Sequence, residues 1–262
     1  MMKREITAIL LSSMFAVSAC SAIGIPSRPT QHGPSNSSHG AAHWGYEGEE
    51  GPAHWATLSA DYHMCAAGSM QSPIDLAAVN ASGDVSLKLD YMPGAVSIAY
   101  NGHTVQANFA PGRSAAIDQR KFELVQLHFH TPSEHVLDAK PFPIEVHFVH
   151  ATHAGELLVV GVLFVEGEAN AELATILDAL GTRPGPVTTK LDPSGLLPHD
   201  LSVFRYMGSL TTPPCSEGVN WHVAKSHISA SAEQIVQLHQ VLGENARPVQ
   251  KHNNRLLLAP AD

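Results

Sequence analysis

The sequence predicts a mainly β domain with a few short helices at its periphery. Most of the chain after residue 40 consists of short segments that are apolar or that alternate between apolar and polar residues, which is typical of strands. An Asn-Gly pair between two such segments indicates a tight hairpin turn. Only two stretches have both the apolar spacing and the end signals of helices.

The predicted strands follow one another through the first part of the domain. Residues 85–89 alternate in polarity, and residues 96–100 and 104–109 flank Asn101-Gly102, where both turn positions need a positive φ. Three more segments cover residues 122–130, 144–150 and 157–165. Gly155 lies between the last two, which favours antiparallel neighbours. The segment 157–165 is almost wholly apolar, and this indicates a central strand that is buried on both faces.

Two helices are predicted, each with a recognisable start and stop. Asn170 can cap a helix over residues 171–180, which carries one apolar stripe and has Gly181 as its stop signal. Residues 231–234, Ser-Ala-Glu-Gln, have the form of a capping box, and the helix that follows stops at Gly243. The ends of the domain are rich in proline, and we expect them to be irregular.

The N-terminal residues have the layout of a secretory signal. Lys3 and Arg4 precede an apolar run too short to span a bilayer, and small residues before Cys20 resemble the site at which bacterial lipoproteins receive their lipid. We therefore expect a signal peptide over 1–19, a lipid on Cys20, a disordered tether over 20–40 and one domain over 41–262. The protein is then exported to the periplasm or cell surface and anchored to a membrane. Ordinary cleavage without lipid is the alternative, and it gives a soluble periplasmic or secreted protein.

The charge balance limits the partners. The formal net charge is −9 with histidine neutral, and lysine and arginine do not cluster. Phosphate contacts need clustered cationic side chains, so we expect no nucleic-acid partner. No further apolar run is long enough to form a membrane-spanning helix.

Two cysteines remain if Cys20 carries lipid. An even pair in an exported domain is a candidate for a disulfide, which here joins Cys65 and Cys215. Two buried free thiols are the alternative.

A metal site is indicated by the spacing of some of the 17 histidines. His128 and His130 lie two residues apart in a predicted strand and so point to the same face. A third ligand from the next strand is His147, His150 or His153. Glu145 favours His147, because a buried carboxylate needs a partner on its own face. Three neutral histidines leave a fourth tetrahedral position for water, which is the layout of a catalytic zinc site.

Polar residues next to these histidines suggest supports for the ligands. Gln126 lies two residues before His128, just as Glu145 lies two before His147, and ligating histidines commonly donate their second N–H to such groups. Glu134 follows the first pair closely and can orient a hydroxyl. Residues 209–215 form a proline-stiffened loop, on which a threonine can pass a hydrogen bond to that carboxylate.

Several longer motifs occur in a fixed order from His43 to Arg255. Together they resemble the α class of carbonic anhydrases, and with the two cysteines they most resemble its bacterial exported branch. The motifs are His43-Trp44-Gly45-Tyr46, Gly51-Pro52-Ala53-His54-Trp55, Gln71-Ser72-Pro73-Ile74-Asp75, Asn101-Gly102-His103, Gln126-Leu127-His128-Phe129-His130, Ser133-Glu134-His135, Glu145-Val146-His147 and Ser209-Leu210-Thr211-Thr212-Pro213-Pro214.

The resemblance implies a fold and a role for each matched residue. The fold is a twisted, largely antiparallel ten-stranded sheet with the zinc at the base of a conical cleft. The implied roles are one Zn²⁺ per chain on His128, His130 and His147; support of these ligands by Gln126, the Asn245 carbonyl and Glu145; orientation of zinc-bound hydroxide by Thr211 and Glu134; proton transfer by His103; an apolar wall for carbon dioxide from Val149, Val159, Leu210, Val219 and Trp221; and a solvent network at Thr212 and Tyr46.

The implied reaction is the reversible hydration of carbon dioxide to bicarbonate and a proton. The sequence departs from the best-known members of the family at Thr131, Gln106 and Ala246, which affects the shape of the pocket and the rate of proton transfer but removes no ligand. A non-catalytic binding module on the same fold, a zinc esterase and a metal-scavenging lipoprotein are the alternatives. The chain is a monomer or a homodimer, which the sequence does not decide.

Overall fold

The computed structural model describes residues 42–182 and 185–261. The predicted signal peptide over 1–19, the tether over 20–40 and the lipid on Cys20 lie outside these residues and stay predictions. Within the described ranges, no helix is both long and apolar enough to cross a membrane.

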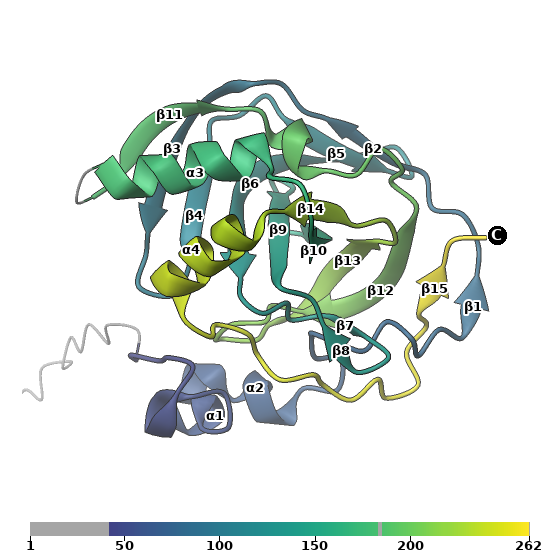
Figure 1. Cartoon of the computed structure of the whole chain (residues 1–262). Coiled ribbons are helices and arrows are strands. Elements are labelled where there is room, and N and C mark those ends of the chain that lie inside the picture. The colour runs from purple at the N-terminus through teal and green to yellow at the C-terminus, as the bar shows by residue number, and fades with distance from the viewer. Residues whose placement is uncertain (1–41, 183–184, 262) are drawn as a thin grey trace, which may run out of the picture. The chain divides into compact units, whose positions relative to one another are not determined.

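One large sheet dominates the domain, as the sequence predicted, and Figure 1 shows it with helices at its periphery. In the described residues the sheet has 13 strands, and the continuous path through it runs β1-β15-β12-β13-β10-β9-β6-β4-β3-β11. The strands are β1 (Ala81–Ser82), β2 (Leu87–Asp90), β3 (Gly94–Tyr100), β4 (Val105–Phe109), β5 (Ser114–Ile117), β6 (Arg120–His130), β9 (Ile144–Ala151), β10 (Leu157–Glu166), β11 (Val187–Leu191), β12 (Val203–Ser209), β13 (Glu217–Ala224), β14 (Ile228–Ala230) and β15 (Leu258–Ala259), while β7 (Val136–Leu137) and β8 (Lys140–Pro141) pair separately.

Most neighbouring strands in this sheet are antiparallel. The parallel pairs are β10 with β13, β10 with β14 and β1 with β15. The ten strands of the continuous path match the expected number, and β2, β5 and β14 lie beside that path.

A hairpin turn lies at Asn101-Gly102 as predicted, and it joins β3 to β4. The expected positive φ is found at Gly102, where φ is +98°, but not at Asn101, so that part of the prediction was wrong. The reason is that four residues, 101–104, separate the paired residues Tyr100 and Val105, so this is not a two-residue turn. The Asn101 side chain closes the turn, because its Oδ1 accepts hydrogen bonds from the backbone N–H groups of His103 and Thr104 at 3.0 and 2.9 Å.

The centre of the sheet is formed by β6, β9 and β10, which pair antiparallel as predicted. Alternate residues of β10 contribute to two different cores, so this strand is buried on both faces, again as predicted. The larger core covers one face of the sheet. The smaller core covers the other face and consists of Ile74, Leu76, Val159, Leu163, Phe204, Tyr206, Val219, Trp221, Val223 and Leu257.

Two longer helices pack on the larger core, and Figure 1 shows both on the same side of the sheet. They are α3 (Ala171–Thr182), which Asn170 caps through hydrogen bonds to two backbone N–H groups, and α4 (Ala232–Leu242), which starts in the predicted capping box and ends at Gly243. One prediction was wrong: Gly181 lies inside the last turn of α3 and does not stop it. Glycine lowers helix stability but does not prevent one more turn.

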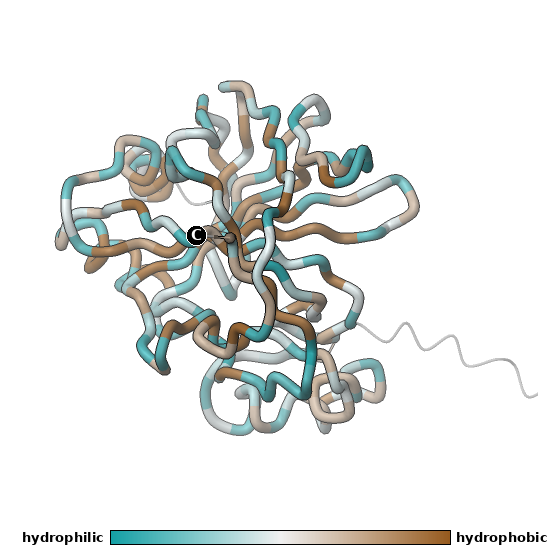
Figure 2. Tube along the Cα trace, turned by 90° about the vertical axis from the view of Figure 1, so that its right-hand side faces the viewer, coloured by the Kyte–Doolittle hydropathy of each residue, from teal (hydrophilic) through white to brown (hydrophobic). Residues whose placement is uncertain are grey.

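Short helices make up the N-terminal part of the described residues. They are η1 (Gly48–Glu50), α1 (Trp55–Leu58), η2 (Ala60–Tyr62) and α2 (Met64–Ala67), with η3 (Pro193–Leu196) later in the chain. The predicted disulfide between Cys65 and Cys215 links α2 to the loop after β12, with Cα atoms 5.0 Å apart. Figure 2 shows hydrophobic residues concentrated along the strands of the interior and hydrophilic residues in the outer loops.

Candidate metal centre and active site

Three histidine rings meet on the face of the sheet that carries the smaller core. His128 and His130 lie on β6, and His147 lies directly opposite His128 on β9. The three ring centroids are 4.6 to 5.1 Å apart, and one nitrogen from each ring lies within 4.8 Å of the others. The other two candidates for a third ligand lie elsewhere: His150 bonds Tyr91 on the opposite face, and His153 is exposed in a turn.

Each of these rings donates one N–H to an oxygen acceptor. The pairs are His128 Nδ1 with Gln126 Oε1 at 2.8 Å, His130 Nδ1 with the Asn245 carbonyl oxygen at 2.8 Å, and His147 Nε2 with Glu145 Oε1 at 2.8 Å. These bonds fix the tautomers, because the bonded nitrogen must carry the proton. The lone pairs at His128 Nε2, His130 Nε2 and His147 Nδ1 are therefore left to face one another.

The surroundings keep all three rings neutral. Burial lowers the pKa of His130 to about 4. Burial, followed by the charges of the other two rings, holds the pKa of His128 well below its usual range, and burial also lowers the pKa of His147. Neutral imidazole is the form that binds a metal ion.

This donor set fits a zinc ion. His130 Nε2 is buried and has no hydrogen-bond partner, a condition that native proteins seldom leave uncompensated. Three converging imidazole nitrogens, each backed by an acceptor on the far side of its ring, match the ligand type and the outer hydrogen bonds of catalytic zinc sites.

A second group of possible ligands, His135 with Glu145 and His147, fits a metal less well. Glu145 is already used in full: Oε1 accepts from the His135 and His147 rings, and Oε2 accepts from the backbone N–H groups of Glu134 and His135. The other nitrogen of His135 bonds the Tyr206 hydroxyl at 2.7 Å. This group is a support for the first one and leaves no free lone pairs for an ion.

Glu134 lies beside the histidine nitrogens. Its Oε2 is 3.4 Å from His130 Nε2 and 3.9 Å from His147 Nδ1, and its Oε1 accepts the backbone N–H of Arg247 at 2.9 Å. Burial raises the pKa of the Glu134 carboxyl to about 7, against the opposing effects of His147, of a hydrogen bond from the Thr211 hydroxyl and of the Arg247 N–H. Thr211 therefore lies near the Glu134 carboxyl, and among the described residues Glu134 Oε2 has no hydrogen-bond partner of ordinary geometry.

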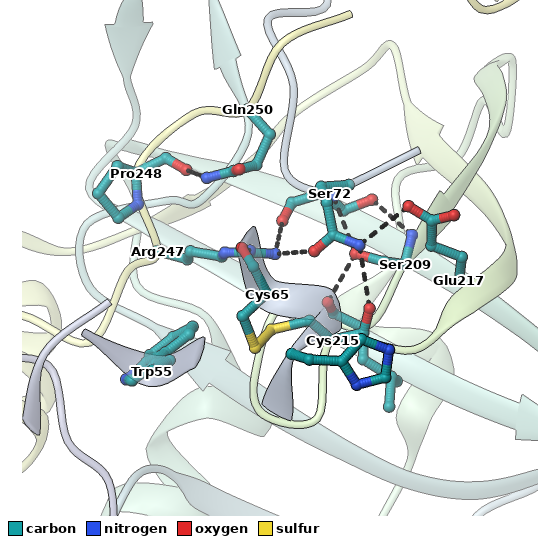
Figure 3. Close-up of a disulfide and its surroundings, with 12 residues drawn as sticks. Trp55, Cys65, Ser72, Ser209, Cys215, Glu217, Arg247, Pro248 and Gln250 are labelled. Carbon is teal, nitrogen blue, oxygen red and sulfur yellow. Dashed lines mark hydrogen bonds between the residues drawn. A yellow bond between two sulfur atoms is a disulfide. The ribbon is translucent and has the colours of Figure 1, made fainter. Parts of the chain in front are cut away.

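The disulfide holds the loop that carries Thr211. Cys215 ends this loop, and its carbonyl accepts a hydrogen bond from Gln71 Nε2 at 3.0 Å. Figure 3 shows the Arg247 side chain next to the disulfide, reaching the residues that follow Cys65. The segment around Cys65 therefore braces both the Thr211 loop and the Arg247 segment.

The residues expected to form the apolar wall belong to the smaller core or pack against it. Val159, Val219 and Trp221 belong to the smaller core, and Val149 and Leu210 pack against it. The Trp221 ring contacts the His147 ring edge-on, with centroids 4.8 Å apart. Thr212 is half-buried on the same loop as Leu210.

His103 lies in the β3–β4 turn, away from the three-histidine cluster. Its ring stacks on Trp44 with centroids 3.7 Å apart, and both rings line a pocket of about 280 Å³ together with Tyr46. Burial and the nearby charge of His43 lower the pKa of His103. An imidazole with this exposure can exchange protons with solvent.

Sequence reasoning missed two residues of this site. Arg247 donates its backbone N–H to Glu134. Sequence alone could not identify this donor, because every residue except proline has a backbone N–H. His135 stood in a recognised motif but received no role, although it is fully buried and bonds both Glu145 and Tyr206. The pairing of His135 with the adjacent Glu134 in one short motif was the available signal.

The fold and the site define a protein with a three-histidine centre on a mixed β-sheet. The model of the eukaryotic-type carbonic anhydrase family matches residues 50–260, and the chain belongs to this family, the α class of carbonic anhydrases. The family and the enzyme class predicted from the motifs are thereby confirmed.

Known relatives are similar over most of their length. A carbonic anhydrase of Pectobacterium carotovorum is 44% identical over 86% of this chain and 93% of its own. One of Nostoc sp. is 38% identical over 98% of this chain and 97% of its own. The solved structure of the α-carbonic anhydrase from Thermovibrio ammonificans with the inhibitor sulfanilamide is 41% identical, covers 84% of this chain and all of that one, and has a TM-score of 0.77.

Proposed function

We propose that this carbonic anhydrase hydrates carbon dioxide reversibly to bicarbonate and a proton, with one zinc ion on His128, His130 and His147. The observation that carries the proposal is the set of three inward lone pairs, each fixed by a hydrogen bond on the far side of its ring. When bound, Zn²⁺ lowers the pKa of a water molecule to about 7 and so supplies a nucleophile at neutral pH.

In this proposal Thr211 and Glu134 orient the attacking oxygen. Glu134 keeps one carboxyl oxygen on the Arg247 N–H, which leaves the other to accept the Thr211 hydroxyl proton. The Thr211 oxygen is then left as an acceptor and can receive a hydrogen bond from the attacking oxygen. Such a fixed acceptor aims a lone pair of the nucleophile at the substrate.

The apolar wall holds the substrate without binding it tightly. Val149, Val159, Val219 and Trp221 offer no donor toward carbon dioxide, while the Trp221 indole N–H is used by the Ser209 carbonyl at 2.9 Å. The negatively charged product loses more hydration energy against this apolar surface than the neutral substrate does, and this favours release of the product.

One proton must leave for each molecule of bicarbonate formed. His103 is assigned this transfer because it combines partial exposure with a ring at the edge of a pocket next to Tyr46. An imidazole is suited to the task, since it changes charge near neutral pH.

The test is to purify the full-length chain, count zinc per chain and follow carbon dioxide hydration by stopped flow. His147→Ala is the variant, and His153→Ala is the matched control, since that histidine is exposed in the turn after the same strand. We expect one zinc and fast hydration in the parent and the control, with both lost in His147→Ala.

Two other outcomes separate the alternatives. A folded protein without zinc refutes the proposal and favours a binding module. Zinc with ester turnover faster than carbon dioxide hydration favours an esterase. The number of zinc ions per chain also tests the metal-scavenging alternative, because scavenging requires several ions per chain.

We also propose that the protein is exported and held at a membrane by a lipid on Cys20. This rests on the sequence before Cys20 alone. Detergent partitioning of the expressed chain tests it: Cys20→Ser is expected to move the protein to the aqueous phase, and continued partitioning into detergent refutes the anchor.

A further inference from the structure

The side chain of Asn245 joins three segments that are far apart in the sequence. Asn245 follows α4, is 1% exposed, and lies between the β3–β4 turn and the end of β6. Its Nδ2 donates to the His103 carbonyl at 3.0 Å and to the Phe129 carbonyl at 3.0 Å, while its Oδ1 accepts the Thr131 N–H at 2.8 Å. Every polar atom of this amide is therefore used.

The backbone of Asn245 has a separate task. Its carbonyl accepts the His130 Nδ1 proton at 2.8 Å, and its N–H donates to the Thr131 carbonyl at 3.2 Å. One residue thus holds a proposed zinc ligand by its backbone and the turn of the proposed proton carrier by its side chain. The two tasks can be separated by substitution, because no side-chain change removes the carbonyl.

The turn that bears His103 has few other ties to the interior. Within the turn, Asn101 and Tyr100 make local bonds, to the N–H groups of His103 and Thr104 and to the Gly102 carbonyl. Thr104 reaches β6 through its hydroxyl, which donates to the Phe129 carbonyl and accepts the Phe129 N–H at 3.1 Å. For His103 itself, Asn101 holds the N–H within the turn, Asn245 holds the carbonyl, and the ring stacks on Trp44.

We propose that the Asn245 side chain is a positioning residue that sets the distance between the proton carrier His103 and the metal centre. This inference rests on the proposed function and extends it. The amide bonds the His103 carbonyl and the Phe129 carbonyl with one NH₂ group, so it fixes the turn against the strand that carries His128 and His130. Proton transfer requires donor and acceptor within hydrogen-bond reach, directly or through water, and is sensitive to displacements of about 1 Å.

The test compares variants of the full-length zinc enzyme. Asn245→Ala removes the amide, and Asn245→Asp keeps its volume and the acceptor for the Thr131 N–H but has no donor for the two carbonyls. Thr131→Val is the matched control: it removes a partly buried bond between the same two segments, from the Thr131 hydroxyl to the Gly243 carbonyl at 2.8 Å, without touching the turn.

We expect the Asn245 variants to lower kcat about 10-fold in dilute buffer, with kcat/KM within about 2-fold of the parent, because only the proton step loses its geometry. Concentrated imidazole buffer should restore kcat by accepting the proton directly. In the zinc-free protein, amide hydrogen exchange at His103 and Thr104 should be faster in the Asn245 variants and unchanged in Thr131→Val.

Two results overturn the inference: unchanged kcat and unchanged exchange in both Asn245 variants, or equal losses in kcat and kcat/KM that imidazole does not restore. The second places the effect at the metal centre. His103→Ala separates this inference from the proposed function. If that variant keeps full kcat in dilute buffer, the role of His103 itself is wrong; if it loses kcat while both Asn245 variants keep it, only the inference about Asn245 fails.

Discussion

Replacing Arg247 with methionine is expected to destabilise the protein strongly while leaving the chemistry largely intact. Arg247 is 3% exposed, and its guanidinium donates to three oxygens: Gln71 Oε1 at 2.9 Å, the Ser72 carbonyl at 2.8 Å and the Cys65 carbonyl at 2.9 Å. It also lies over the Trp55 ring, 5.7 Å from its centroid. Figure 3 shows Trp55, Cys65 and Ser72 near Arg247 and the disulfide.

The magnitude follows from these contacts. Hydrogen bonds to a charged donor contribute about 1.5–3 kcal/mol each, and two of the three acceptors here are buried. Burial lowers the pKa of Arg247 to about 10, so the side chain stays charged at neutral pH. Methionine keeps the contact with Trp55 but satisfies none of the acceptors. We expect Arg247→Met to lower the free energy of unfolding by about 4 kcal/mol.

Urea unfolding of the oxidised protein measures this loss. With an m-value of about 2–3 kcal/mol/M for a domain of this size, the midpoint should fall by about 1.5 M. Arg120→Met is the control, since Arg120 pairs with Glu156 at an exposed site, and such pairs contribute less than about 1 kcal/mol. Equal, small shifts in both variants refute the reasoning. Because the Arg247 N–H to Glu134 is a backbone group, kcat/KM should stay within about 5-fold of the parent; a larger loss shows that the guanidinium positions Glu134.

Two further predictions concern the chemistry and the response to acid. Thr211→Val should lower kcat/KM for carbon dioxide about 10²-fold, because it removes one fixed partner of the attacking oxygen. Thr212→Val is the control and should change kcat/KM far less. Stopped-flow hydration measures both variants, and a Thr211→Val rate equal to that of the parent shows that Thr211 has no part in the mechanism. Burial lowers the pKa of His150 to about 4 and that of His222 to about 3. Between about pH 6.5 and these values the unfolded chain therefore binds more protons than the folded chain, so the free energy of unfolding decreases as the pH is lowered. From about pH 7 to about pH 5 each group should cost about 2 kcal/mol, and His222→Leu should remove its share of the drop in urea unfolding of the zinc-free protein; an unchanged pH slope contradicts the burial of a neutral ring.

The positions of the metal-facing histidines could be predicted because strand periodicity is local. Residues two apart on a strand share a face, so His128 and His130 pointed together, and Glu145 distinguished His147 from His150. The structure has this register, with His128 opposite His147. The Asn-Gly turn and the capping box were equally readable, since each depends on only a few neighbouring residues.

The rest of the site depends on contacts that no local pattern encodes. Strands β12 and β13 were not predicted, because Arg205 and Gly208 interrupt the first and Gly218 lies near the start of the second. Strand β13 nevertheless supplies Val219 and Trp221. The support of Glu134 by a backbone N–H and the side-chain bonds of Asn245 join residues more than a hundred positions apart, and only the fold brings them together.

The order in which the chain is synthesised bears on how its centre is completed. The three histidines lie on β6 and β9, but the groups that fix His130 and Glu134 belong to the segment from Gly243 to Arg247, which leaves the ribosome after both strands and after β10, β12 and β13. A nascent chain that stops short of this segment carries the three rings without an acceptor for one of them and without the N–H that holds the carboxylate. The centre therefore gains its full set of hydrogen bonds only in a chain that includes the segment from Gly243 to Arg247.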